Sequence, residues 1–301
     1  MSDDATFPVT VQRITLPDSA VTTEDVTARE EPLEIRVEGR SVAVVMRTPG
    51  HDEELVAGFL VSEGVITRAR DVLEISQCPS TGNKYGNVVD VLLAGSAVVN
   101  WDSLTRHVFS ASSCGICGKT SIESVFQRFP VLKASAQCSV LGAQSDKEIP
   151  SSATEHCELS TEHSVFRVSP ALLASLPAKL RASQATFTQT GGLHASAIFD
   201  EHGEMLVLRE DVGRHNALDK VLGWALQRRL LPFQRHILLV SGRVSFELMQ
   251  KALAAGVPIV AAISAPSSLA VQFADDSGQT LVGFLRGETM SVYTHPDRVK
   301  A

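Results

Sequence analysis

The sequence has only five cysteines among 301 residues, and this low, odd number excludes a small fold held together by a disulfide framework. It also lacks a long apolar run. The longest, Leu253 to Ala265, is short and is interrupted by Pro258, so we expect no membrane-spanning segment. The first residues, Met1 to Thr6, are acidic and lack the apolar core of a signal peptide. We therefore expect a cytoplasmic protein, in a reducing compartment that keeps its thiols available.

Positive charge is scarce as well. The 27 lysines and arginines are outnumbered by 34 aspartates and glutamates, which gives a formal net charge of −7. This balance argues against a general nucleic-acid-binding protein, which would be basic overall. Any anionic ligand must therefore be held by local basic residues. The chain is long enough for a large core, 44% of its residues are hydrophobic, and we expect two domains.

The order of apolar and polar segments predicts an α/β protein in three regions. Residues 1–25 are polar and are expected to be mobile. Residues 26–112 are expected to form a small α+β domain, with a helix that begins within 48–54 and ends at Gly64. Residues 113–301 are expected to hold a Cys-x-x-Cys loop and an α/β domain, because apolar strands alternate with helices there. The expected strands of this domain are Leu193–Phe199, Met205–Leu208, Ile237–Val240, Pro258–Ile263, Thr280–Leu285 and Met290–Tyr293.

The most distinctive local feature is the pair Cys114 and Cys117, flanked and separated by glycines. Small neighbours leave both sulfurs reachable and let the backbone bend sharply. The following residues, 120–123, read as a capping box that begins a helix, and Lys119 stands beside it. The positive end of a helix and an ammonium group both favour thiolate over thiol. We therefore expect two reactive thiols on an exposed loop.

Three chemistries fit this pair when the residues alone are considered. A structural zinc knuckle would need two further ligands, and no second Cys-x-x-Cys exists, so we expect no bound metal. A thioredoxin-like redox pair would place its first cysteine at the start of the helix, whereas Cys114 comes several residues early. A sulfur carrier would hold a persulfide on one cysteine. The other possible metal ligands occur singly, at Cys78, His107, Cys138, His156 and Cys157.

Arginines follow the ends of three predicted strands. Arg214, Arg243 and Arg286 each stand beside a glycine in these exits. Ligands of open α/β sheets bind beyond the carboxyl ends of strands, and guanidinium forks match the geometry of phosphate. We therefore predict a phosphorylated ligand, with His215 as a possible contact and His194 as a weaker one. The alternative is that these arginines form ordinary surface salt bridges with Glu210, Asp211 and Glu288.

Several stretches together resemble the formate dehydrogenase accessory sulfurtransferase family, FdhD. The resemblance runs in order from about Glu31 to Arg298. It departs from the family pattern in a longer loop over 134–163 and at Glu288-Thr289, where a small or basic residue is commoner. The stretches that carry it are Cys114-Gly115-Ile116-Cys117-Gly118, Glu210-Asp211-Val212-Gly213-Arg214-His215-Asn216-Ala217-Leu218-Asp219-Lys220, Val292-Tyr293-Thr294-His295-Pro296, Gly58-Phe59-Leu60-Val61-Ser62-Glu63-Gly64 and Leu281-Val282-Gly283-Phe284.

The resemblance implies a sulfurtransferase that takes sulfur from a cysteine desulfurase as a persulfide on Cys114, assisted by Cys117. The sulfur would pass to the molybdenum cofactor in its bis-guanine-dinucleotide form, which formate dehydrogenase, the client, requires. The resemblance also implies a homodimer and a cytidine-deaminase-like three-layer α/β/α domain. GDP would be a partial mimic of the cofactor, better than ADP if Glu210 or Asp211 accepts hydrogen bonds from guanine. The cofactor-binding stretch maps onto Phe284, Leu285, Arg286, Gly287, Glu288 and Thr289.

Two other functions stay open: a non-enzymatic chaperone that binds the cofactor, and a thiol–disulfide oxidoreductase. The zinc chemistry of deaminases does not fit, because their signature places cysteines at helix starts. The comparable starts here, 213–215 and 242–245, carry no cysteine. The fold of those enzymes is thus expected without their metal site.

Overall fold

The computed structural model describes residues 5–17, 19–78, 87–95, 99, 101–104, 132 and 166–300. The loop with Cys114 and Cys117, the helix expected after it and the long loop expected over 134–163 lie outside these residues. Within the described residues no helix is both long enough and apolar enough to cross a membrane.

A six-stranded sheet forms the centre of the larger domain, in the order β12-β11-β10-β9-β7-β8. The neighbours β9, β10 and β11 are parallel, whereas β7 runs antiparallel to β9 and β12 antiparallel to β11. Every residue of β9 and β10 is buried, as expected for parallel strands that are covered on both faces. The strands are β7 (His194–Phe199), β8 (Met205–Asp211), β9 (Ile237–Val240), β10 (Ile259–Ala262), β11 (Thr280–Arg286) and β12 (Thr289–Thr294).

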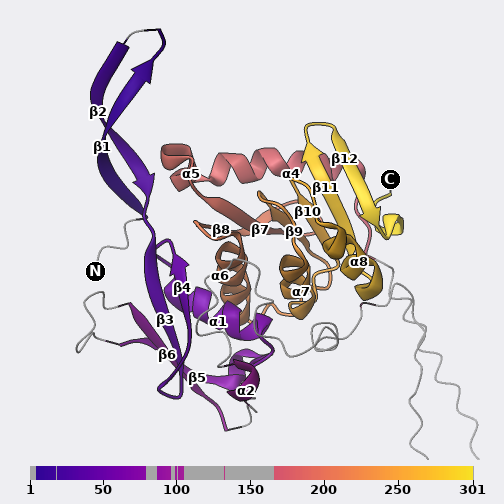
Figure 1. Ribbon diagram of the computed structural model, residues 1–301. Coiled ribbons are helices and arrows are strands. Elements are labelled where there is room, and N and C mark those ends of the chain that lie inside the picture. The colour runs from indigo at the N-terminus through magenta and orange to yellow at the C-terminus, as the bar shows by residue number, and fades with distance from the viewer. Residues whose placement is uncertain are drawn as a thin grey trace, which may run out of the picture.

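Helices cover both faces of this sheet, as Figure 1 shows. One face packs against α4 (Pro170–Ser183), which the Ser169 side chain caps by accepting a hydrogen bond from the amide of Leu172 at 3.1 Å. The opposite face packs against α6 (Arg214–Gln227), α7 (Phe246–Ala254) and α8 (Ser268–Ser277). The predicted α/β class with three layers is therefore confirmed, whereas the likeness to cytidine deaminases stays a prediction.

The smaller unit is a four-stranded sheet in the order β4-β3-β6-β5, with α1 (Asp52–Ser62) packed on it. It is the small α+β unit expected over residues 26–112. Residues Glu38 and Gly39 turn between β3 and β4 with positive φ angles of 52° and 74°, as a tight hairpin turn requires. The elements are β3 (Glu31–Val37), β4 (Arg40–Arg47), η1 (Ala69–Asp71), β5 (Val72–Gln77), β6 (Val88–Leu93) and α2 (Trp101–Leu104).

The two units pack together through α1 and α6. A Cβ atom on Gly58 of α1 would lie 1.7 Å from the carbonyl oxygen of Asp219, and one on Gly223 of α6 would lie 1.8 Å from that of Glu54. Glycine at both positions lets the two backbones touch. Nearly every residue of α1 is buried as a result, because the small sheet covers one side of the helix and α6 another.

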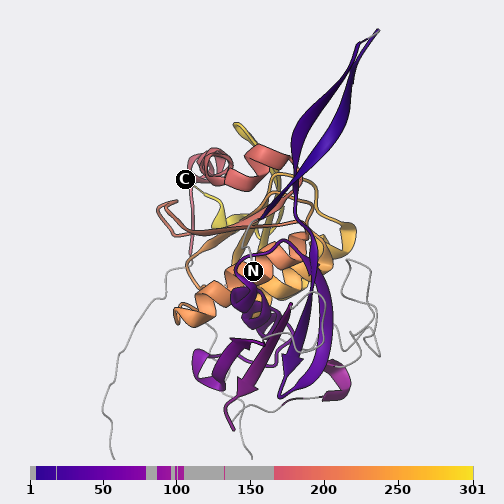
Figure 2. The same cartoon turned by 90° about the vertical axis from the view of Figure 1, so that its left-hand side faces the viewer.

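A β-hairpin, β1 (Thr6–Thr15) and β2 (Ser19–Ala28), extends away from both sheets (Figures 1 and 2). Residues 1–25, which their polar composition predicts to be mobile, thus form most of this hairpin. The segment is rich in threonine and valine, which favour extended backbone. Phe7, Val9 and Val11 alternate with other residues, but Ile14 breaks this alternation and no residue of either strand is fully buried. The base of the hairpin meets α5 (Ala185–Thr190) and the glycines after it, where a Cβ on Gly192 would lie 3.4 Å from the Cβ of Ala28.

Candidate functional site

The candidate site is the sheet edge at which β8, β9, β10 and β11 end. Because β7 is antiparallel to β9, its first residue, His194, lies at the same edge. The predicted arginines therefore come to one side of the sheet: Arg214 follows β8, Arg243 follows β9, and Arg286 ends β11. This is the edge at which ligands of α/β proteins bind.

His194, Arg214 and Arg243 gather around Gly242. The Ser241 amide donates to the Ala195 carbonyl at 2.9 Å, and the Ala195 amide donates to Ser241 Oγ at 2.9 Å, which ties the start of β7 to the end of β9. A Cβ on Gly242 would lie 3.1 Å from His194 Nδ1 and 3.8 Å from Arg214 Cδ. The absence of a side chain at Gly242 thus leaves room for the imidazole.

This cluster is electrostatically positive. Burial, and then the charges of Arg214 and Arg243, lower the pKa of His194 against the opposing charge of Asp211. The Nε atom of Arg214 is buried and has no hydrogen-bond partner among the described residues. Arg243 is exposed. The arrangement is therefore suited to an anion.

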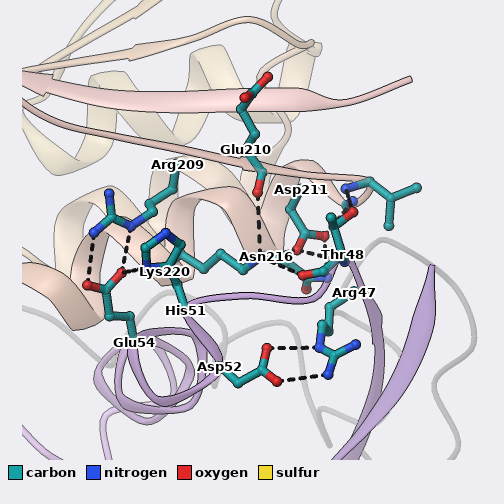
Figure 3. A network of polar contacts seen from close by, with 12 residues as sticks. Arg47, Thr48, His51, Asp52, Glu54, Arg209, Glu210, Asp211, Asn216 and Lys220 are labelled. Carbon is teal, nitrogen blue, oxygen red and sulfur yellow. Dashed lines mark hydrogen bonds and ion pairs between the residues drawn. The ribbon is translucent and has the colours of Figure 1, made fainter. Parts of the chain in front are cut away.

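Asp211 is the acid nearest this cluster in the sequence. Its side chain does not pair with the arginines but takes part in the contact between the two units (Figure 3). Its side chain is fully buried, and Oδ2 lies 2.7 Å from Nζ of the equally buried Lys220. Oδ2 also accepts from the Thr48 amide at 3.1 Å, while Oδ1 accepts from the Gly213 amide at 2.8 Å and from Asn216 Nδ2 at 3.0 Å. These contacts join the end of β8 to the loop between β4 and α1.

Glu210 points to the opposite side of β8, where its two carboxylate oxygens accept from the amides of Thr186 at 3.0 Å and Phe187 at 2.9 Å. A carboxylate is favourable there because these amides begin α5. The alternative in which Glu210 and Asp211 form surface salt bridges with the site arginines is therefore wrong for these two acids. That either of them accepts hydrogen bonds from guanine stays a prediction.

Further ion pairs reinforce the same contact (Figure 3). Arg209 donates to both carboxylate oxygens of Glu54 at 2.6 and 2.9 Å, and so connects β8 to α1. Within the small unit, Arg47 donates to Asp52 at 2.9 and 2.8 Å and is almost fully buried. Such two-pronged contacts fix the relative orientation of the groups they join.

His215 faces a second buried network. Its Nε2 lies 3.2 Å from Ser245 Oγ and 3.3 Å from Glu247 Oε2. Burial, followed by the positive charges of Lys251 and Arg214, lowers the pKa of His215 to about 3. The imidazole is therefore neutral at pH 7 although the Glu247 carboxylate lies 3.3 Å away.

Beyond Glu247 the network continues to the interface with α1. Lys251 Nζ lies 3.9 Å from Glu247 Oε1, donates to Asp219 at 2.8 and 3.0 Å, and donates to Ser62 Oγ at 2.9 Å. Burial would lower the pKa of Lys251, but the charges of Asp219 and Glu247 outweigh it and raise that pKa. Lys251 is therefore a buried ammonium paired with Asp219.

The stretch expected to bind the cofactor forms the end of β11, a turn and the start of β12. The Phe284 amide donates to the Ser264 carbonyl at 3.1 Å, and Arg286 Nε donates to the Ile263 carbonyl at 2.9 Å, so both are held against the end of β10. Phe284 is exposed and has a φ of 51°, a strained conformation for a residue with a side chain. Leu285 is fully buried in the core, so its side chain packs rather than facing the edge. Gly287, Glu288 and Thr289 are exposed.

The structure thus places His194, Arg214, His215 and Arg243 together. Arg286 ends a strand two places from β9, about 10 Å along the edge given the usual strand spacing. The roles of these residues in binding stay predictions.

Among the described residues, no three metal-ligating side chains lie close enough together to hold a metal ion. Of the possible zinc ligands named from the sequence, only Cys78 belongs to the described part of the chain.

The network behind His215 is not predicted by the sequence patterns. The position of Lys251 four residues after Glu247, on one face of a helix, was a weak signal. Nothing local showed that Ser62 and Asp219, which are far apart in the chain, would meet at this lysine.

The fold and this edge define a two-part α/β protein with a candidate site for an anionic ligand. The chain belongs to the FdhD/NarQ family, whose sequence model matches residues 28–147 and 131–300. The family membership expected from the motifs is therefore confirmed.

Relatives of the chain are named "Sulfur carrier protein FdhD". One from Streptomyces coelicolor is 48% identical, and the match covers 95% of this chain and 93% of the relative. One from Mycobacterium tuberculosis is 46% identical over 94% of each chain, and one from Sulfolobus acidocaldarius is 41% identical over 92% of each. A crystal structure from Desulfotalea psychrophila, of a protein described as a formate dehydrogenase accessory protein, matches with a TM-score of 0.72 and 24% identity. It covers 98% of this chain and 100% of that one, and it supports the fold.

Proposed function

We propose that this protein carries sulfur to the molybdenum cofactor that formate dehydrogenase needs. The observation that carries the proposal is the 41–48% identity, over nearly the whole chain, to proteins named as sulfur carriers. The sulfur donor in this proposal is a cysteine desulfurase, and Cys114 holds the transferred sulfur as a persulfide. The cytoplasmic location and the homodimer stay predictions.

The transfer balances if both cysteines take part. The Cys114 thiolate attacks the outer sulfur of the donor persulfide, the donor S–S bond breaks, and its electron pair leaves on the donor thiolate. For delivery, the Cys117 thiolate attacks Sγ of Cys114, and the outer sulfur leaves as sulfide to the metal. A Cys114–Cys117 disulfide remains, which a cellular thiol then reduces. The cysteines thus supply the two electrons that turn persulfide sulfur into sulfide.

The sheet edge supports the cofactor part of the proposal. A bis-guanine-dinucleotide carries two pyrophosphates, and guanidinium groups bind phosphate in a two-pronged geometry. The edge offers Arg214 and Arg243 near one end and Arg286 about 10 Å further along. These arginines stand in a chain whose net charge of −7 would otherwise repel phosphate.

Intact mass measurement after incubation with a cysteine desulfurase and cysteine tests the proposal. We expect the wild type and Cys78→Ala to gain one sulfur atom, and Cys114→Ala to gain none. Cys78→Ala is the matched control, because Cys78 is half-buried beside β5 of the small sheet. Cys117→Ala is expected to keep the persulfide but to deliver it poorly. A wild type that binds the cofactor but never gains sulfur would instead be a chaperone.

A further inference from the structure

The hairpin of β1 and β2, called the arm from here on, is exposed over its whole length. Its strands pair with each other along ten residues each and with no third strand among the described residues. At the tip, Leu16 is 85% and Ile14 65% exposed. An isolated two-stranded hairpin is at best marginally stable in water. We therefore expect the arm to pack against another surface.

The base of the arm is held to the body of the protein, so that the arm points in a defined direction (Figures 1 and 2). The Arg29 amide donates to the Ala5 carbonyl at 2.9 Å, and its guanidinium donates to the Thr6 carbonyl at 3.1 and 3.2 Å. The guanidinium also lies 5.3 Å from the centroid of the Phe7 ring and 3.5 Å from the Glu31 carboxylate of β3. A partner of the arm thus meets a surface that is already ordered, which lowers the entropic cost of binding.

The two faces of the arm differ in polarity. Side chains alternate between the faces of a strand, and directly paired residues of two strands share a face. The middle of one face is polar, with Thr10, Gln12, Thr22 and Glu24. The other face, called the valine face from here on, carries the apolar residues Phe7, Val9, Val11 and Val21. The valine face is therefore the one that gains most from being covered.

The valine face also carries one cation and one anion, at different distances from the base. Arg13 and Asp25 form an ion pair at 3.4 Å, and both side chains are accessible to solvent. Arg13 lies one pair nearer the tip than Val11, and Asp25 one pair nearer the base. From base to tip, the pairs on this face are Phe7–Thr27, Val9–Asp25, Val11–Thr23, Arg13–Val21 and Thr15–Ser19.

This order makes the valine face complementary to itself. When two arms pack face to face about a two-fold axis at Val11, they run antiparallel, and the tip of each lies at the base of the other. Each Arg13 then reaches the level of Asp25 in the other copy, and each Val21 the level of Val9. We propose that the valine face is a contact surface between two copies of this chain, paired in this antiparallel register.

The size of the face indicates how strong the contact is. Ten residues at about 3.3 Å each, in two strands with a combined width of about 10 Å, bury roughly 700 Å² in total when two arms meet. Interfaces below about 1,200 Å² are typically weak, so we expect a dimer that depends on protein concentration. The family resemblance implies a homodimer but no surface for it. The inference does not depend on the proposed function.

Sedimentation equilibrium of the full-length protein, over a range of concentrations, tests the surface. We expect the wild type to pass from monomer to dimer as its concentration rises. Val11→Lys removes two covered valines and brings two ammonium groups together at the axis, so it should weaken dimerisation about 100-fold or more. Gln12→Lys adds the same charge on the opposite face and should dimerise as the wild type does.

Exchanging the charges tests the register. Arg13→Glu leaves two anions on the valine face, and Asp25→Lys leaves two cations. Each variant alone should dimerise about 10-fold more weakly than the wild type, because like charges meet between the copies. An equimolar mixture should recover the association, because each anion then meets a cation of the other variant. Like charges stay side by side within each arm, so this recovery reports contact between copies.

Three results would overturn the inference. The first is a wild type that stays monomeric at every concentration. The second is a Val11→Lys variant that dimerises as Gln12→Lys does, and the third is a mixture that associates no more than its separate components. The proposed function is measured independently: a monomer that still gains sulfur on Cys114 leaves the sulfur carrier standing, and an arm-dependent dimer that gains none leaves the surface standing.

Discussion

Gly58 of α1 lies against the backbone carbonyl of Asp219 in α6, so closely that a Cβ atom would come within 1.7 Å of the oxygen. Gly223 of α6 meets the carbonyl of Glu54 in the same way. The small unit is therefore joined to the large one at backbone contact. This contact also positions Ser62, which meets Lys251 and Asp219 behind the candidate site.

The glycine contact predicts a large stability cost for one methyl group. Gly58→Ala should lower the free energy of unfolding by about 1–3 kcal/mol or more, because two packed helices must separate. Gly95→Ala is the control, since a Cβ there meets nothing within 4 Å. Urea unfolding followed by circular dichroism measures both variants. An unchanged midpoint for Gly58→Ala would show that the helices do not pack this closely.

The Lys220–Asp211 pair predicts a second cost. Lys220→Met leaves the fully buried Asp211 carboxylate without its counter-charge, which should destabilise the protein by about 3–5 kcal/mol. Lys179→Met, which removes an exposed ion pair with Glu204, should cost about 0–1 kcal/mol. Chemical denaturation compares the two. Equal effects would mean that burial gives this pair no greater weight in stability than an exposed ion pair has.

The low pKa of His215 predicts how stability depends on pH. The unfolded imidazole has a pKa near 6.5 and the folded one near 3, so the unfolded state binds more protons between these values. Stability should therefore rise with pH across that window, by at most about 1.4 kcal/mol per pH unit from this group.

His215→Gln should flatten this part of the pH–stability curve, whereas His202→Gln, in an exposed turn, should keep the wild-type slope. Denaturant titrations at several pH values between about 3 and 6.5 provide the measurement. A curve for His215→Gln that is as steep as the wild type would locate the proton uptake in another group.

Much of the architecture could be predicted from local patterns. The expected strand Ile237–Val240 coincides with β9, because a short apolar run between polar turns permits little else. The hairpin β1–β2 was missed because its apolar residues do not face a core; Ile14 and Val21, for example, are more than half exposed. Apolar alternation identifies a strand because one face of the strand is buried, and neither β1 nor β2 has a buried face.

The candidate site could be predicted only in part. Arg214, Arg243 and Arg286 were placed at one edge correctly, since parallel strands end on the same side of a sheet. The salt bridges considered for Glu210 and Asp211 with these arginines do not form, because the partners of both carboxylates come from distant segments. The Glu210 carboxylate accepts hydrogen bonds from amides of α5, and the Asp211 carboxylate pairs with Lys220. The local sequence pattern does not predict such long-range contacts.

Phe284, which is exposed and has a strained backbone at this edge, tests whether this position serves binding. Its φ of 51° costs about 1–2 kcal/mol for a residue with a side chain. Phe284→Gly removes that strain but adds chain entropy to the unfolded state, so the free energy of unfolding should stay within about 1 kcal/mol of the wild type.

Arg229→Gly is the matched control, because Arg229 is exposed, has a φ of 59° and lies at the far end of α6. We expect both variants to fold and only Phe284→Gly to bind GDP more weakly, because it loses an exposed ring beside Arg286. Calorimetry and urea unfolding measure the two properties separately. If Phe284→Gly binds GDP as tightly as Arg229→Gly does, the strain at Phe284 belongs to the packing of β11 and not to the ligand.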